Sequence, residues 1–283
     1  MSHYARVDRL GATRAGTADA RLPGVVPKPA HPGRPAASTE PARLIHLDPD
    51  LAVVAKPSGL SLQTPRRDPE GAVGRLLAAL PEGERRELGA GPVLLVHRLD
   101  VGTSGLVVVA RSAAVHRALV QAFSERRVEK RYLALVWGRP RPGRGIYDVP
   151  LAPDRRDRRR MGADPAGRRA VTRYAVRAVG PSVALVELAP ETGRTHQIRV
   201  HLAAAGHPIV GDDLYGGPRH RGVRDPALRR ALAPAHTLLH AWRLRLPAPP
   251  LAGALELEAP LPAAFAAALA LCGIEGEPGT PVL

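Results

Sequence analysis

The chain contains 283 residues, of which 41 are Lys or Arg and 26 are Asp or Glu, so its formal net charge is +15 and its pI is about 11.2. A single cysteine, Cys272, excludes a disulfide framework and a four-cysteine metal site, and no apolar run approaches the ~20 residues that a membrane helix requires. The first residues lack the apolar core of a signal peptide, so we expect a cytoplasmic protein that has no membrane partner. The excess of positive charge attracts phosphate polymers and favours a nucleic acid as the partner.

Two composition changes divide the chain. Residues 1–42 contain six prolines and no long apolar periodicity, which predicts a flexible, basic, Pro-rich arm. From Leu44 onward apolar patterning is continuous, and no linker-like stretch separates two domains. We therefore expect one catalytic-size domain over 43–272 and a short C-terminal tail over 273–283.

Apolar periodicity and turn residues predict the elements of this domain in chain order. They are a strand at 51–56, a helix at 71–80, strands at 93–96 and 106–111, a helix capped by Ser112, strands at 130–138, 170–176 and 183–189, a helix at 195–206, strands near 238–246 and 254–259, and a helix at 262–271. Residues 139–169 are expected to form an Arg-rich loop region. Because strands outnumber helices and strict βαβ alternation is rare, we expect an α+β fold with a mixed, mainly antiparallel sheet and flanking helices.

The segment VHRLDVGTSGLVVVARS (96–112) places an acid between two strands. Asp100 follows the first strand and precedes a tight Gly/Thr/Ser/Gly loop, where a side chain is held rigidly and can remain accessible. Asp100 is therefore a candidate catalytic residue. The alternative is that its carboxylate only caps its own turn.

Two further segments carry candidate site residues. In ETGRTHQIRVHLAAAGHPIVGDDLYGG (191–217), Arg194 lies just before a predicted helix, and an Arg facing a lone carboxylate keeps it ionised and oriented. In EKRYLALVWG (129–138), Tyr132 lies in a strand among basic residues and could stack on a base. Taken singly, Arg194 could be a surface cation and Tyr132 a packing residue.

Together with KPSGLSLQTP (56–65) and LLHAWRLRLPAP (238–249), these segments occur in one order that resembles the RNA pseudouridine synthases of the RluA branch. The resemblance runs from about residue 43 to about residue 265. It implies the pseudouridine synthase catalytic fold and the isomerisation of specific uridines in ribosomal or transfer RNA. That reaction involves neither redox change nor group transfer to a second molecule, so no cofactor and no metal are expected.

The resemblance also implies roles for individual residues. Asp100 matches the essential aspartate, Tyr132 the aromatic residue that stacks on the uracil, and Arg194 is expected to pair with the aspartate. Arg98 matches a residue that helps to hold the flipped nucleotide, and Ile198 matches an aliphatic position near the base. His97, Thr103 and Ser104 are further candidate substrate-binding residues. Two departures from the family are expected: Gln63 stands where relatives often have histidine, and the basic Pro-rich arm is too short to be the S4 RNA-binding domain that is frequent in the family.

The expected partner is a structured RNA stem-loop, bound by a protein that acts as a monomer. Arginine clusters at 154–160 and 219–230 could contact phosphates or could be merely solvated. The main alternative function is a non-catalytic RNA-binding or ribosome-assembly protein on the same fold.

Other chemistries are disfavoured by spacing. Ser104 lies in G-T-S-G rather than in the G-x-S-x-G of a serine hydrolase. His236 and His240 have H-x₃-H spacing, but they lie in a predicted strand without a suitable acidic ligand, so structural histidines are expected instead of a zinc site.

Overall fold

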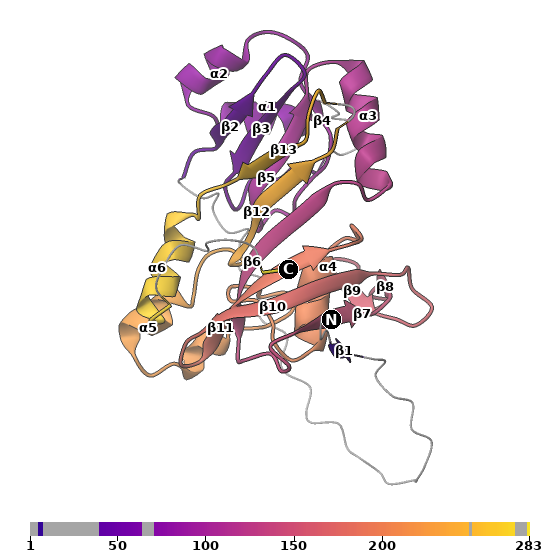
Figure 1. Cartoon of the computed structure of the whole chain (residues 1–283). Coiled ribbons are helices and arrows are strands. Elements are labelled where there is room, and N and C mark those ends of the chain that lie inside the picture. Colours follow the sequence, from indigo (N-terminus) through magenta and orange to yellow (C-terminus); the bar gives the residue numbers. More distant parts are fainter. Residues whose placement is uncertain (1–4, 8–39, 64–70, 249–250, 275–281) are drawn as a thin grey trace.

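The main element of the chain is an 11-stranded sheet with the order β1-β7-β10-β11-β6-β12-β5-β3-β2, to which β13 and β4 add at β12 and β5 (Figure 1). The computed structural model describes residues 5–7, 40–63, 71–248, 251–274 and 282–283. Within them all strand pairs of this sheet are antiparallel except β1–β7 and β12–β5. The predicted mixed, mainly antiparallel sheet is confirmed.

The strands of the large sheet are β1 (Ala5–Val7), β2 (Arg43–Leu47), β3 (Leu51–Lys56), β4 (Leu94–Leu95), β5 (Ser104–Ala110), β6 (Glu129–Trp137), β7 (Arg144–Asp148), β10 (Val171–Val179), β11 (Val183–Pro190), β12 (Leu239–Leu246) and β13 (Leu255–Glu258). A separate hairpin pairs β8 (Leu151–Pro153) with β9 (Met161–Ala163). The helices are α1 (Gly71–Ala78), α2 (Glu82–Leu88), α3 (Ala113–Ser124), α4 (Gln197–Ala204), α5 (Pro226–Ala231) and α6 (Ala263–Leu271), with a 3₁₀ turn at Arg219–Gly222.

The strongly patterned elements lie where the sequence predicts them. Every residue of β5 is buried, as its continuous apolar run requires for a strand covered on both faces. Helix α3 begins at the predicted cap, where the Ser112 hydroxyl accepts a hydrogen bond from the Val115 N–H at 3.2 Å.

The prediction that residues 139–169 form a loop region is wrong in part, because this segment contains the strands β7, β8 and β9. β7 pairs with β10, and β8 pairs with β9. No local apolar pattern in the sequence indicates these short strands, because they depend on their pairing partners. The predicted arm over 1–42 lies mostly outside the described residues, although Ala5–Val7 pair in parallel with β7.

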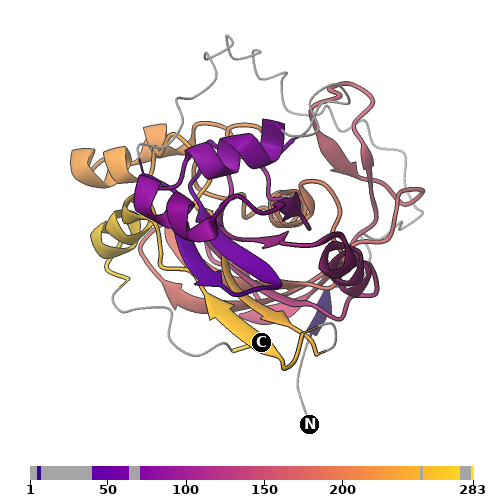
Figure 2. The same ribbon diagram turned by 90° about the horizontal axis from the view of Figure 1, so that it is seen from above.

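The helices form three groups around the sheet (Figures 1 and 2). Helices α1, α2 and α3 contact the half formed by β2, β4 and β5, whereas α4 contacts β10 and β11 in the other half, and α5 and α6 pack on each other. No helix among the described residues is long and apolar enough to cross a bilayer.

The centre of the sheet brings two distant segments together. Ala241 of β12 is in register with Gly105 of β5 on one side and with Tyr132 of β6 on the other. Gly105 has φ +112°, and a Cβ built there would lie 2.2 Å from the Ala241 carbonyl oxygen, so only glycine allows this approach. The loop that precedes β5, which carries Asp100, is thereby placed beside Tyr132.

Candidate active site

A cavity of about 170 Å³, here called the Asp100 pocket, lies where the loop before β5, strand β6 and the start of α4 meet. Its lining residues are mainly polar and basic: Arg98, Asp100, Thr103, Lys130, Tyr132, Pro190, Thr192, Gly193, Arg194, Thr195, His196, Gln197, Ile198, Arg199 and Leu239. An adjoining cavity of about 440 Å³ shares Arg98, Lys130, Tyr132, Thr192, Gly193 and Arg194 with it. Together they form a continuous, mainly basic hollow, in which Asp100 is the one carboxylate that lines the Asp100 pocket itself and Glu191 lines the adjoining cavity.

A buried lysine, Lys56, fixes the backbone next to Asp100. The Lys56 ammonium, in a residue only 1% exposed, donates to the carbonyl oxygens of Pro57 (2.9 Å), Leu60 (3.1 Å) and Val101 (3.4 Å). Burial lowers the pKa of Lys56 to about 7, and the negative charge of Asp100 partly opposes that shift. Because Val101 directly follows Asp100, Lys56 fixes the backbone of the loop that carries the carboxylate.

Arg199 and His196 face the carboxylate from α4 and from the residue before it. Arg199 Nη1 lies 3.7 Å from Asp100 Oδ2, and His196 Nε2 lies 3.9 Å from the same oxygen. Arg199 is itself oriented by Asp212, whose carboxylate accepts from Nε at 2.7 Å and from Nη2 at 2.8 Å. This two-pronged bond leaves Nη1 directed at Asp100.

The predicted ion pair between Arg194 and Asp100 is therefore wrong: Arg199 forms it. Arg194 lines the pocket, but its Nε donates to the Arg169 carbonyl oxygen at 3.2 Å. Arg194 lies in the loop before α4, whereas Arg199 lies in the first turn of the helix, where its guanidinium and the His196 ring both come close to Asp100 Oδ2. The sequence alone could have indicated Arg199 as a second candidate, because Arg194 and Arg199 both belong to GRTHQIR.

Besides Asp100 and Arg194, four of the predicted residues lie in the wall of the pocket. Tyr132 lines it beside Asp100, and burial together with the negative charge of Asp100 raises the pKa of its hydroxyl, which stays protonated. Ile198 is 7% exposed and supplies an apolar surface, and Arg98 is exposed at the rim of both cavities. Thr103 is also part of the wall, although it is buried.

Two predicted substrate-binding residues have structural contacts instead. Ser104 is buried, and its hydroxyl lies 2.9 Å from His240 Nδ1 and 3.4 Å from the Leu239 carbonyl oxygen. His97 stacks on Phe123 at 4.5 Å, and its Nε2 accepts a hydrogen bond from the Val108 N–H, so it contributes only to the wall of the adjoining cavity. Burial lowers the pKa of His97 to about 3.

Gln197 shapes the loop that lines the pocket, a role that sequence reasoning missed. Its side-chain oxygen accepts from the Thr192 hydroxyl and the Arg194 N–H, and its amide nitrogen donates to the Val171 carbonyl and the Thr172 hydroxyl. All of these bonds are between 2.6 and 3.0 Å long. Among the described residues no group of three or more His, Cys, Asp or Glu side chains is arranged to hold a metal ion.

Comparisons with known proteins agree with this architecture. The sequence profile of the RNA pseudouridylate synthase family matches residues 50–204, which include Asp100, Tyr132 and Arg199. The chain therefore belongs to the RNA pseudouridylate synthase family, whose members are isomerases of uridine in RNA.

Within this family the chain is of the RluA type. It is 38% identical to the dual-specificity RNA pseudouridine synthase RluA of Escherichia coli K12, over 77% of this chain and 92% of that protein. It is 39% identical to an uncharacterized RNA pseudouridine synthase of Zymomonas mobilis, over 79% of this chain and 95% of the relative. The solved structure of human RNA pseudouridylate synthase domain containing 4 is similar with a TM-score of 0.65 and 29% identity, and the match covers 82% of this chain and 94% of that one.

Proposed function

We propose that the chain converts a specific uridine in ribosomal or transfer RNA to pseudouridine with Asp100 as the catalytic residue, after drawing the nucleotide out of its stem-loop into the Asp100 pocket. The observation that carries this proposal is the single carboxylate of the basic Asp100 pocket, which faces Arg199 beside the ring of Tyr132 and lies on a loop whose backbone Lys56 holds. Two relatives support the choice of RNA by their names: the dual-specificity RNA pseudouridine synthase RluA of Escherichia coli and the ribosomal large subunit pseudouridine synthase D of Haemophilus ducreyi.

The chemistry needs what this pocket supplies. The N1–C1′ bond of uridine breaks, the uracil turns, C5 bonds to C1′, C5 loses its hydrogen and N1 gains one, so the atoms balance without a second reactant. An ionised carboxylate can act as the nucleophile or base. Tyr132 and Ile198 would hold the detached uracil between an aromatic ring and an apolar side chain while it turns.

Arg98 is placed to assist the extraction of the base. Removing a nucleotide from its stack costs a few kcal/mol. Arg98 is exposed at the rim that the two cavities share, so its guanidinium could occupy the vacated space and contact phosphates. The wall around it adds Lys130 and Arg194, which suit a phosphate backbone.

The test uses RNA transcribed with [5-³H]uridine, because pseudouridine formation releases the tritium from C5. Ribosomal and transfer RNA sequences of the organism that encodes the chain are the substrates. Asp100→Asn should lower tritium release at least about 10³-fold while RNA binding stays within about three-fold, since the amide keeps the shape and loses the charge. Asp50→Asn, the same change at an exposed position of the β2–β3 turn, is the matched control.

Tritium release by Asp100→Asn at the wild-type rate would overturn the proposed role of Asp100. RNA binding by the wild-type chain without any tritium release would instead favour the alternative of a non-catalytic RNA-binding or ribosome-assembly protein. We also propose that the protein acts as a monomer, which light scattering coupled to size-exclusion chromatography measures directly.

A further inference from the structure

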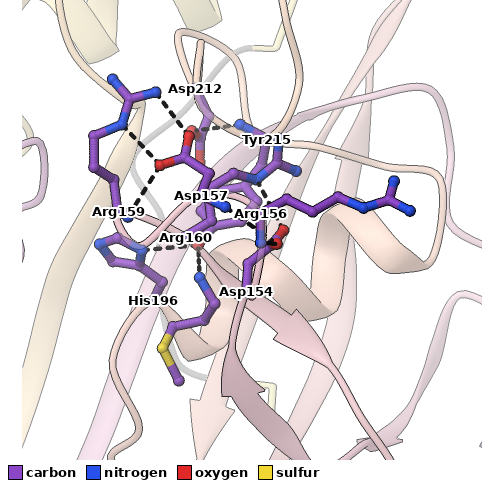
Figure 3. A network of polar contacts seen from close by, with 9 residues as sticks. Asp154, Arg156, Asp157, Arg159, Arg160, His196, Asp212 and Tyr215 are labelled. Atoms are coloured by element: carbon purple, nitrogen blue, oxygen red, sulfur yellow. Dashed lines mark hydrogen bonds and ion pairs between the residues drawn. The ribbon is translucent and has the colours of Figure 1, made fainter. Parts of the chain in front are cut away.

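Tyr215 connects the Asp100 pocket to the Arg-rich hairpin of β8 and β9. Its hydroxyl accepts a hydrogen bond from the Met161 backbone N–H at 2.8 Å and lies 2.8 Å from His196 Nδ1 (Figure 3). The guanidinium groups of Arg160 and Arg199 lie 5.1 and 4.9 Å from the centre of its ring. The position of the hydroxyl is therefore fixed from several sides.

These contacts select one tautomer of His196. A backbone N–H can only donate, so the bond from Met161 uses a lone pair of the Tyr215 hydroxyl, and the described contacts of that hydroxyl offer its proton one acceptor, His196 Nδ1. A neutral imidazole whose Nδ1 accepts carries its own proton on Nε2. Nε2 is the nitrogen that faces Asp100, 3.9 Å from Oδ2.

The backbone also directs this side chain into the pocket. His196 has φ 55° and ψ 17°, the left-handed conformation that costs a non-glycine residue about 1 kcal/mol, and α4 begins at the next residue. Its side chain is only 14% exposed. Strain of this kind persists where the surroundings require it, and here it brings the imidazole to the carboxylate.

We propose that His196 is a positioning residue for Asp100: as the Nε2–H tautomer that Tyr215 selects, it donates to Oδ2 during the reaction. Arg199 and His196 then both hold Oδ2, and Oδ1 is the oxygen left to meet the substrate. The inference rests on the proposed catalytic role of Asp100.

The charges around His196 favour the neutral imidazole that this role needs. Burial has the largest effect and lowers the pKa of His196. The negative charges of Asp100 and Asp212 raise this pKa, and the positive charges of Arg199 and Arg98 lower it. The net shift is downward, so the ring is neutral near pH 7. The 3.9 Å separation exceeds a hydrogen bond, and a small closure on substrate binding would complete the contact.

Three substitutions separate this role from packing. In His196→Gln the amide nitrogen takes the place of Nε2 and keeps a donor toward Asp100, whereas in His196→Asn the shorter amide takes the place of Nδ1 and loses that donor. Asn also tolerates the left-handed backbone better than Gln, so a purely structural role predicts the opposite order of effects. Tyr215→Phe removes only the hydroxyl and keeps the ring between the two guanidinium groups.

The readouts are single-turnover tritium release from [5-³H]uridine-labelled ribosomal and transfer RNA, RNA affinity, and Tm. We expect a rate about 10- to 100-fold lower for His196→Asn, within about three-fold of wild type for His196→Gln, and reduced several-fold for Tyr215→Phe, with RNA affinity within about two-fold throughout. Equal rates for the Asn and Gln variants, or a wild-type rate for Tyr215→Phe, would overturn the inference. Asp100→Asn is measured in the same assay. If Asp100→Asn is active, the proposed catalytic role of Asp100 fails, and this inference fails with it. If Asp100→Asn is inactive but His196→Asn is fully active, only this inference is overturned.

Discussion

Asp212→Asn should destabilise the protein because it removes the charge that neutralises Arg199. The two hydrogen bonds between these side chains are 2.7 and 2.8 Å long, and the side chains are only 11% (Arg199) and 1% (Asp212) exposed. Breaking a buried ion pair by removing one partner costs ~3–5 kcal/mol. Arg199 retains Asp100 at 3.7 Å, so we expect the lower end of that range.

A loss of about 3 kcal/mol in the free energy of unfolding corresponds to a Tm lower by ~6–12 °C for a domain of this size. Urea unfolding and calorimetry measure both quantities. The rate of tritium release should fall as well, because Arg199 Nη1 is then no longer directed at Asp100. The matched control is Asp213→Asn, the same change at the exposed neighbouring position, which should stay within ~0.5 kcal/mol.

A double-mutant cycle with Arg199→Met tests the reasoning itself. If the cost of Asp212→Asn comes from the Arg199 charge, that cost should shrink by ~1 kcal/mol or more when Arg199 is already methionine. A cost that is the same in both backgrounds, or no larger than that of Asp213→Asn, would refute the assignment of Asp212 as the group that orients Arg199.

Two further predictions concern stability. Gly105→Ala should cost at least ~3 kcal/mol in the free energy of urea unfolding, since its Cβ would lie 2.2 Å from the Ala241 carbonyl oxygen at φ +112°. Gly74→Ala, at an exposed position of α1, should be neutral or stabilising, and similar effects of the two changes would contradict the close approach of β5 and β12. Burial lowers the pKa of His201 and of His240 to about 4, so between about pH 6.5 and about pH 4 the unfolded chain binds protons that the folded chain does not, and stability falls as the pH falls through that window. The urea midpoint measured against pH should show this fall, and His240→Gln should flatten it by up to ~1.4 kcal/mol per pH unit; an unchanged slope would contradict the buried, neutral state of His240.

Local sequence pattern predicted some elements of the fold, whereas others form only through tertiary strand pairing. The continuous apolar run of β5 and the Ser112 cap of α3 predicted their elements because burial and capping act over a few neighbouring residues. The strands β7, β8 and β9 were missed because they are short and become strands only through partners elsewhere in the chain.

The site divides in the same way. From its motifs alone, the sequence determined the family, the candidate aspartate Asp100 and the aromatic residue Tyr132, because these signals are residue types at fixed spacing. Only the tertiary structure decided which arginine faces Asp100, since Arg194 and Arg199 belong to one motif and differ in where the turn into α4 directs them. The same holds for Lys56, Asp212 and Tyr215, whose contacts with the site depend on folded distances between segments far apart in the chain.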